Sequence, residues 1–232
     1  MSGVHFFDPE GILSLRENGY RDTAMALAEL IDNSIQAEAK NIRIILLERI
    51  KEGKRRTWNV DEILIVDDGH GMTKEETKSC LRFGGGTRHG AKKGLGKFGF
   101  GLPNSSASQC PRFEVYTWKD PAVVYRNYFD FNEIYKEKNE YLPDVEESEN
   151  LPGLFSHLGI DITKNNTVIR WVRCDRLSYK TGGRLAKHIE KPIGRIFRHF
   201  INDDSVNIKL DVYQDNGDKI TKKKGDSINK VK

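Results

Sequence analysis

Near the start of the chain, apolar residues at helical spacing are followed directly by two segments in which polar and apolar residues alternate. Leu27, Ile31 and Ile35 recur at every fourth position in a stretch rich in alanine and leucine, which predicts an amphipathic helix with one buried face. Residues 41–50 and 62–69 then alternate between polar and apolar and contain many β-branched side chains. This pattern predicts two neighbouring strands joined as a hairpin. The first third of the chain therefore combines a helix with paired strands.

A glycine-rich segment comes after the hairpin. Thr73 and Glu76 have the spacing of a capping box, so we expect a short helix that ends at about Leu81. Residues 84–101 then contain eight glycines and four cations but no acidic residue. This composition predicts a flexible, basic loop. The sequence LPNSSASQ after it is expected to be helical.

The second half of the chain continues the mixture of strands and helices. Strands are expected at RFEVYTW, AVVYRNYFDF, TVIRWV and SVNIKLDVYQDNGDKI. A helix is expected at GRLAKHIEKPIGRIFRHFI, where Pro192 either kinks the helix or starts a second one. Residues 136–153 are polar and acidic and are expected to be a surface insertion. We expect one domain over residues 1–215 and a basic, disordered tail over residues 216–232.

Composition excludes several classes of protein. The 232 residues are 37% hydrophobic and 31% charged, without an apolar run approaching the ~20 residues of a membrane span. The net charge of +4 is too small to indicate a polyanionic partner. Cys80, Cys110 and Cys174 lie far apart, which supports neither a disulfide framework nor a zinc site. The N-terminus lacks the pattern of a secretory signal. We therefore expect a cytoplasmic protein, or a nuclear one in a eukaryotic cell, with no membrane partner.

The predicted first helix carries two polar residues suited to chemistry. Glu29 and Asn33 lie four residues apart, so their side chains lie on one face about a turn apart. An amide oxygen can complete a Mg²⁺ shell shared with phosphates, and a carboxylate one turn earlier can deprotonate an attacking water. Taken alone, this spacing is more typical of a solvent-facing helix surface.

The end of the second predicted strand carries a carboxylate beside two glycines, Asp67, Gly69 and Gly71. A buried carboxylate at this place can accept a hydrogen bond from an exocyclic amine. The glycines let a flat ring approach the backbone closely. In isolation the motif is more typical of a simple turn after an edge strand.

The glycine-rich loop suits an anion better than it suits a known nucleotide motif. Residues 94–99 satisfy GxGxxG, but no strand directly precedes them, and a P-loop is excluded because Phe98 stands where Ser or Thr is required. Backbone N–H groups of residues 99–101 at the start of a helix can form an anion nest, to which Lys97 adds charge. The alternative is a plain flexible loop.

Together these patterns have the order and spacing of one family. The segments ALAELIDNSIQA, ILIVDDGHGM and GLGKFGFGLPNSS resemble the N-box, the DxGxG box and the glycine-rich lid of the GHKL ATPases. This class contains gyrase B subunits, MutL, the large heat-shock chaperones and histidine kinases. NNTVIRWV falls where the family has a strand that opens with Gly-Thr, with Asn166 in place of the glycine. The phrases AELIDNS, FGGGTR and KFGFGLPNSS look most like Microrchidia (MORC) ATPases and their bacterial relatives. The resemblance covers about residues 20–175.

The resemblance implies an α+β fold, a two-layer α/β sandwich known as the Bergerat fold. Its sheet would be mixed but mostly antiparallel and covered by helices on one face. A long glycine-rich ATP lid would span about residues 72–101.

The resemblance also implies a role for each matching residue. Glu29 would be the general base, Asn33 the Mg²⁺ ligand and Asp67 the partner of the adenine amine. Gly71 and Met72 would line the base pocket, and Thr167 would bond to Asp67 or its water. Further ATP-binding residues would come from the lid: Thr87, Gly96, Lys97, Phe98, Gly99, Phe100, Gly101 and Leu102. Gln36 stands where many members carry Asp, so the contacts on that side of the pocket differ.

The implied activity is Mg-dependent binding and slow hydrolysis of ATP, in which ordering of the lid drives formation of a homodimer. Residues 4–13 are a candidate strap between protomers, or a cover for the protomer's own sheet. In MutL-like members a lysine of a following domain contacts the terminal phosphate, so slow turnover is expected of what resembles a fragment of a larger MORC-like protein.

Two other functions remain open. One is a nucleotide sensor or interaction module that does not hydrolyse ATP. The other is a DNA-associated clamp, with DNA bound at residues 51–56 or 222–224, or with DNA or a protein client bound through further domains.

Overall fold

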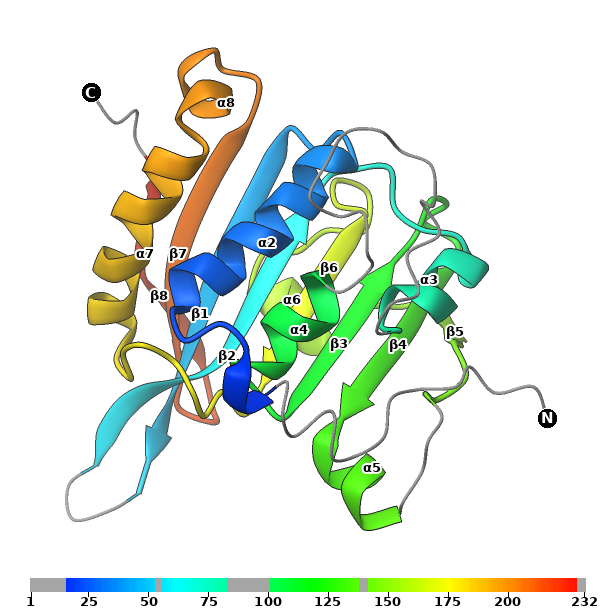
Figure 1. Cartoon of the computed structure of the whole chain (residues 1–232), viewed down its shortest axis with the longest axis horizontal. Helices are drawn as coiled ribbons and strands as arrows, with labels where there is room; N and C mark the ends of the chain where they lie inside the picture. The colour runs from blue at the N-terminus through cyan, green and yellow to red at the C-terminus, as the bar shows by residue number, and fades with distance from the viewer. Residues whose placement is uncertain (1–15, 53–55, 83–100, 138–141, 229–232) are drawn as a thin grey trace.

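The chain forms one eight-stranded sheet in the order β5-β4-β3-β6-β2-β1-β7-β8 (Figure 1). The computed structural model describes residues 16–52, 56–82, 101–137 and 142–228. Neighbouring strands are antiparallel except β1 and β7, which are parallel. The expected hairpin is β1–β2. The strands are β1 (Asn41–Lys51), β2 (Thr57–Asp67), β3 (Arg112–Thr117), β4 (Val124–Asp130), β5 (Glu146–Ser148), β6 (Thr167–Val172), β7 (Asn207–Asp215) and β8 (Ile220–Ser227).

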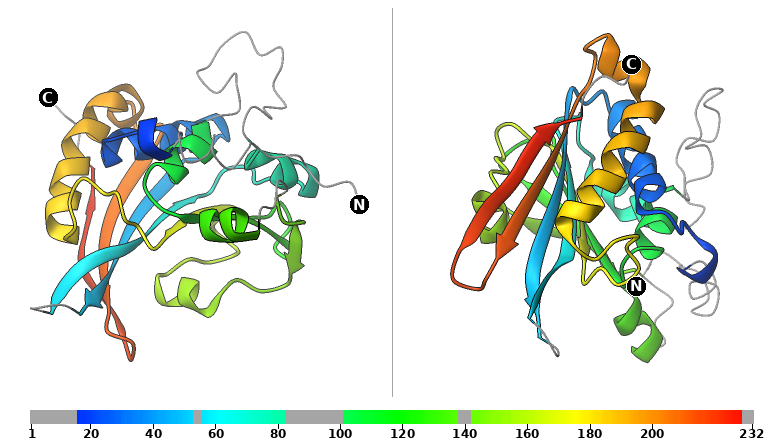
Figure 2. Two further views of the ribbon diagram at one scale, coloured as in Figure 1. Left: turned by 60° about the horizontal axis from the view of Figure 1, so that its bottom comes forward. Right: turned by 90° about the vertical axis from the view of Figure 1, so that its left-hand side faces the viewer.

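Helices α2, α4 and α7 cover one face of the sheet (Figure 2). Asp22 is the N-cap of α2 and accepts a hydrogen bond from Ala24 N at 2.7 Å. The apolar face of α2 packs against alternate residues of β1 and β2, which explains the four-residue spacing seen in the sequence. The helices are α2 (Thr23–Gln36), α3 (Lys74–Cys80), α4 (Gly101–Ala107), α5 (Phe131–Glu137), α6 (Gly153–His157), α7 (Gly182–Ile196) and α8 (Arg198–Asn202).

The expected fold class is confirmed, with one addition on the second face of the sheet. The segment from Leu151 to Ile162, which includes α6, covers part of that face with a smaller apolar cluster. Tyr116 and Phe155 meet edge to face there, with ring centroids 5.0 Å apart. Along these strands, alternate side chains therefore point to opposite faces of the sheet and join two separate apolar clusters.

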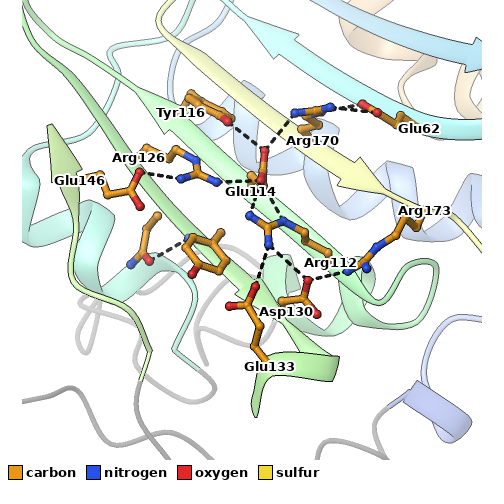
Figure 3. Close-up of polar contacts among 12 residues, drawn as sticks. Glu62, Arg112, Glu114, Tyr116, Arg126, Asp130, Glu133, Glu146, Arg170 and Arg173 are labelled. Atoms are coloured by element: carbon orange, nitrogen blue, oxygen red, sulfur yellow. Dashed lines mark hydrogen bonds and ion pairs between the residues drawn. The ribbon is translucent and has the colours of Figure 1, made fainter. Parts of the chain in front are cut away.

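An ion-pair network lies beside the smaller cluster, on the same face of the sheet. Figure 3 shows Glu114 at its centre. The Glu114 carboxylate accepts hydrogen bonds from Arg112, Arg126, Arg170 and Tyr116 at 2.9 to 3.3 Å. Arg170 also makes two bonds to Glu62, at 2.6 and 2.9 Å. The network thus links four neighbouring strands.

The expected disordered tail is wrong over residues 220–227, which form β8. Two of its three lysines are paired: Lys222 Nζ lies 2.9 Å from Asp211 Oδ1, and Lys224 Nζ lies 3.3 Å from Asp226. A basic composition suggests disorder, but the edge of β7 offers backbone groups to pair with, and nearby carboxylates neutralise the charge.

Three other expectations meet a definite outcome. The capping box at Thr73 and Glu76 is confirmed and opens α3. Helix α7 runs through Pro192, and the next helix starts at Arg198 rather than at the proline. The polar stretch 136–153 contributes the short strand β5, which pairs with β4.

Within the described residues no helix is long and apolar enough to cross a membrane. The candidate strap lies outside those residues.

Candidate functional site

The strand ends that carry the sequence-predicted Asp67 and Thr167 meet on the helix-covered face of the sheet. Asp67 ends β2, and its register partner Thr167 begins β6. Thr167 is in turn paired with Thr117 at the end of β3. Helix α2 lies over this edge and contributes Ser34, which bonds directly to Asp67. One helix and three strand ends therefore build the site.

Asp67 is a buried carboxylate with two hydrogen bonds. Its Oδ2 accepts from Ser34 Oγ at 2.8 Å, and its Oδ1 accepts from Gly69 N at 2.9 Å. Burial raises the pKa of Asp67 to about 6, although the two hydrogen bonds act in the opposite direction. A carboxylate has about four lone-pair sites, so Asp67 can still accept a hydrogen bond from a donor on a ligand.

The turn after β2 packs tightly against its neighbours. Gly71 has a φ of 65°, and a Cβ at this position would lie 2.0 Å from the carbonyl oxygen of Trp118. A Cβ at Gly69 would lie 2.8 Å from the carbonyl oxygen of Ala37 at the end of α2. The glycines therefore serve close backbone packing here. His70 N donates to Ala37 O at 3.0 Å, which ties the turn to α2.

The hydroxyl of Thr117 organises the strand ends beside Asp67. It accepts a hydrogen bond from Met72 N at 2.9 Å and lies 3.0 Å from Asn166 O. The Thr167 hydroxyl lies 3.2 Å from the Thr117 hydroxyl. The expected bond from Thr167 to Asp67 or its water stays a prediction. The backbone of Asn166 is fixed to the end of β2, because its N–H donates to Asp67 O at 2.9 Å.

Glu29 lies between Tyr20 and the start of α4. Its Oε2 accepts a hydrogen bond from the Tyr20 hydroxyl at 3.2 Å. Burial, together with the neighbouring Glu29, raises the pKa of Tyr20. A Cβ at Gly101 would lie 2.2 Å from Glu29 Oε1. The first residue of α4, which was expected to help bind phosphate, therefore packs directly against the expected general base.

Asn33 lies one turn after Glu29 and is partly exposed. Among the described residues, no group of three His, Cys, Asp or Glu side chains could hold a metal ion. Nearby, the Gln36 side chain donates to Asp32 at 2.5 Å, so it is engaged within α2.

Part of the expected ATP-binding set lies outside the described residues. These residues are Thr87, Gly96, Lys97, Phe98, Gly99 and Phe100. Leu102 is described and packs against the larger core.

Ser34 and Thr117 belong to the site but carry no sequence prediction. A signal existed for Ser34, because it follows Leu27 and Ile31 at the spacing of the buried helix face, where a polar residue needs a partner. Thr117 has no such signal, because its neighbours at Met72 and Asn166 are set by strand pairing and by the turn.

Comparisons with known proteins agree with the fold. A family model described as histidine kinase-, DNA gyrase B- and HSP90-like ATPase matches residues 20–157, more than half of the chain. The chain therefore belongs to this family of ATPases and carries an ATPase domain of the GHKL type. The family implies that the domain binds ATP. A comparison with curated proteins finds no match.

A solved structure shares the fold. The N-terminal domain of a DNA repair protein, known from a crystal structure, aligns with a TM-score of 0.53 and 15% sequence identity. The alignment covers 91% of this chain and 54% of that chain. The chain thus spans about half the length of this structural relative.

Proposed function

We propose that the protein binds Mg·ATP, hydrolyses it slowly, and couples ordering of the lid to formation of a homodimer. The observation that carries the proposal is the buried Asp67 at the end of β2. Two hydrogen bonds from the protein orient its carboxylate, which retains acceptor sites for an adenine amine.

The other roles follow from the positions around Asp67. Glu29 is the proposed general base, since its carboxylate lies at the start of α4, where the lid ends. Asn33 would hold Mg²⁺ together with the nucleotide's phosphates, and the ion would supply charge stabilisation of the transferring phosphoryl group. Met72 and Gly71 would line the base pocket, and residues 96–102 would surround the phosphates. The lid residues Thr87 and Lys97 complete the proposed site.

Isothermal titration with a non-hydrolysable ATP analogue and Mg²⁺ tests the adenine pocket. The wild type is expected to bind in the micromolar to sub-millimolar range. Asp67→Asn should weaken binding by about 10- to 100-fold, because a charge-assisted hydrogen bond is worth about 1.5–3 kcal/mol. Equal affinity of the two proteins would contradict the assigned role of Asp67, and absence of binding by folded wild type would contradict the proposed function.

Glu29→Gln separates hydrolysis from binding. The variant should bind the analogue like the wild type, because the amide keeps the shape of the side chain. Its single-turnover hydrolysis should fall by about 10²- to 10⁴-fold, the range of general-base catalysis. A wild type that binds ATP but shows no turnover would favour the alternative, a nucleotide sensor that does not hydrolyse ATP.

Two more specific hypotheses accompany the proposal. The first is that the chain is part of a MORC-like protein, and the second, an alternative, is that it acts as a DNA-associated clamp. The phrases AELIDNS, FGGGTR and KFGFGLPNSS support the first. The fold shared with a domain of a DNA repair protein makes the second worth testing.

A further inference from the structure

Helix α7 presents a stripe of four cations to solvent. Arg184, Lys187, Lys191 and Arg195 are all exposed and follow one another at spacings of three or four residues. At about 100° per residue they lie within an arc of about 80°, and they extend over about 17 Å of the helix axis. The opposite side of α7 is buried in the larger core. Helix α7 lies along the left-hand side of the molecule in Figure 1, and this side faces the viewer in the right-hand view of Figure 2.

Within the described residues, none of these four cations is paired with a carboxylate. The acidic residue on α7, Glu190, lies 3.9 Å from Lys224 instead. The nearby carboxylate of Asp22 contacts His188, with 2.9 Å between Asp22 Oδ2 and His188 Nε2. Arg198, the first residue of α8, adds a further exposed cation next to the end of the stripe.

The basic runs that stand out in the sequence are different in this respect. Lys222 is paired with Asp211 and Lys224 with Asp226, so two of the three lysines in the 222–224 run are neutralised. Lys51, at the start of the 51–56 run, is paired with Asp61. Helix α7 thus carries four exposed cations without a carboxylate partner among the described residues, although the sequence shows no continuous basic run there.

We propose that the cation stripe of α7 binds the phosphate backbone of double-stranded DNA without sequence preference. A line of unpaired cations about 17 Å long matches a polyanion that carries phosphates along about five base-pair steps of 3.4 Å. The apolar side of α7 is buried, so the helix cannot insert that side into a bilayer. This inference does not depend on nucleotide binding, and it is tested without ATP.

Fluorescence anisotropy with a labelled 20-base-pair duplex of random sequence tests the proposal over a series of salt concentrations. The triple variant Lys187→Gln/Lys191→Gln/Arg195→Gln should bind at least ten-fold more weakly at about 100 mM salt. The slope of log K against log salt should become shallower by up to about 2.7, because each lost phosphate contact removes about 0.9.

A second triple variant controls for net charge. Lys40→Gln/Lys209→Gln/Lys219→Gln removes the same charge from exposed positions that have no ion pair within the described part of the chain. It should keep an affinity and a salt slope close to those of the wild type. A thermal melt checks the fold of each variant, and the single variants Lys187→Gln and Lys191→Gln replace the first triple variant if it fails to fold.

Three outcomes would overturn the proposal. The wild type could fail to bind DNA at low salt, or the two triple variants could lose affinity equally, which would assign binding to net charge alone. The third is binding to phosphatidylserine vesicles but not to DNA. Ile196 and Phe200 are exposed near the end of the stripe and make this vesicle comparison necessary.

Discussion

Asp67 combines burial with a carboxylate that the proposed function needs in its ionised form. Its pKa of about 6 lies well above the ordinary 3.8 because desolvation disfavours the charge. Near neutral pH it is mostly ionised and can accept a hydrogen bond from an amine. Burial therefore disfavours the charged form of Asp67, and a hydrogen-bond donor on a ligand would offset part of this desolvation cost.

This raised pKa predicts how stability depends on pH. Between about pH 4 and 6 the unfolded chain has released the Asp67 proton while the folded protein still holds it, so the free energy of unfolding falls as pH rises. The total contribution is about 3 kcal/mol. Urea unfolding of wild type and Asp67→Asn over this range should show the extra fall only in the wild type. Parallel curves for the two proteins would argue against the raised pKa.

At the scale of elements, the contact between α4 and α2 positions the proposed general base. Gly101→Ala would place a Cβ 2.2 Å from Glu29 Oε1, so the Glu29 side chain must move. We expect single-turnover hydrolysis to fall by at least ten-fold, since a displacement of about 1 Å can cost 10²-fold. Stability should stay level or rise by up to about 1 kcal/mol, because Gly-to-Ala changes favour helices.

Gly183→Ala is the matched control for this variant. Gly183 also lies in the first turn of a helix, and a Cβ there would meet no atom within 4 Å. Its hydrolysis rate should equal that of the wild type. If Gly101→Ala is as active as Gly183→Ala, then Glu29 is either not the base or tolerates the displacement.

At the scale of the whole molecule, the ion-pair network in Figure 3 ties four strands together. Burial alone would raise the pKa of Glu114, but Arg126 and Arg170 overcome this effect and hold it below its usual value. Glu114→Gln should lower the free energy of unfolding by about 3–5 kcal/mol near neutral pH, because it leaves arginines partly buried and uncompensated.

The stability difference between wild type and Glu114→Gln should depend on pH, and an exposed ion pair provides the control. Because the folded-state pKa is depressed, the stabilisation is present above the unfolded pKa of about 4.3 and is lost as pH falls. The gap between wild type and variant should therefore narrow in acid. Lys74→Gln, which breaks the exposed pair with Glu147, should change the free energy of unfolding far less, because exposed ion pairs contribute little to stability. Similar losses in both variants would refute a special role for the network.

The proposed coupling between nucleotide and assembly is also a property of the whole molecule. Sedimentation velocity should show a shift from monomer to dimer when the non-hydrolysable analogue and Mg²⁺ are added at saturating concentration. Asp67→Asn should remain monomeric at the same concentrations. A wild type that stays monomeric while saturated with the analogue would separate ATP binding from dimerisation.

The sequence by itself determined the local elements and the polar residues that they carry. The four-residue spacing of α2, the alternation in β1 and β2, and the capping box of α3 are short-range patterns set by backbone geometry and solvent exposure. The resemblance to the GHKL class rested on such local motifs, and it correctly gave the α+β fold.

Contacts between distant residues were decided only by the tertiary structure. The partners of Ser34 and Thr117 depend on which strands become neighbours, and the order β3-β6-β2 cannot be read from any local pattern. Strand β8 forms because the edge of β7 supplies backbone partners and Asp211 supplies charge, which overrides a basic composition. The stripe on α7 is recognised only in the tertiary structure, which leaves these four cations without a carboxylate partner within the described residues. Charge compensation depends on distances of a few ångströms in the folded chain, whereas composition records only totals.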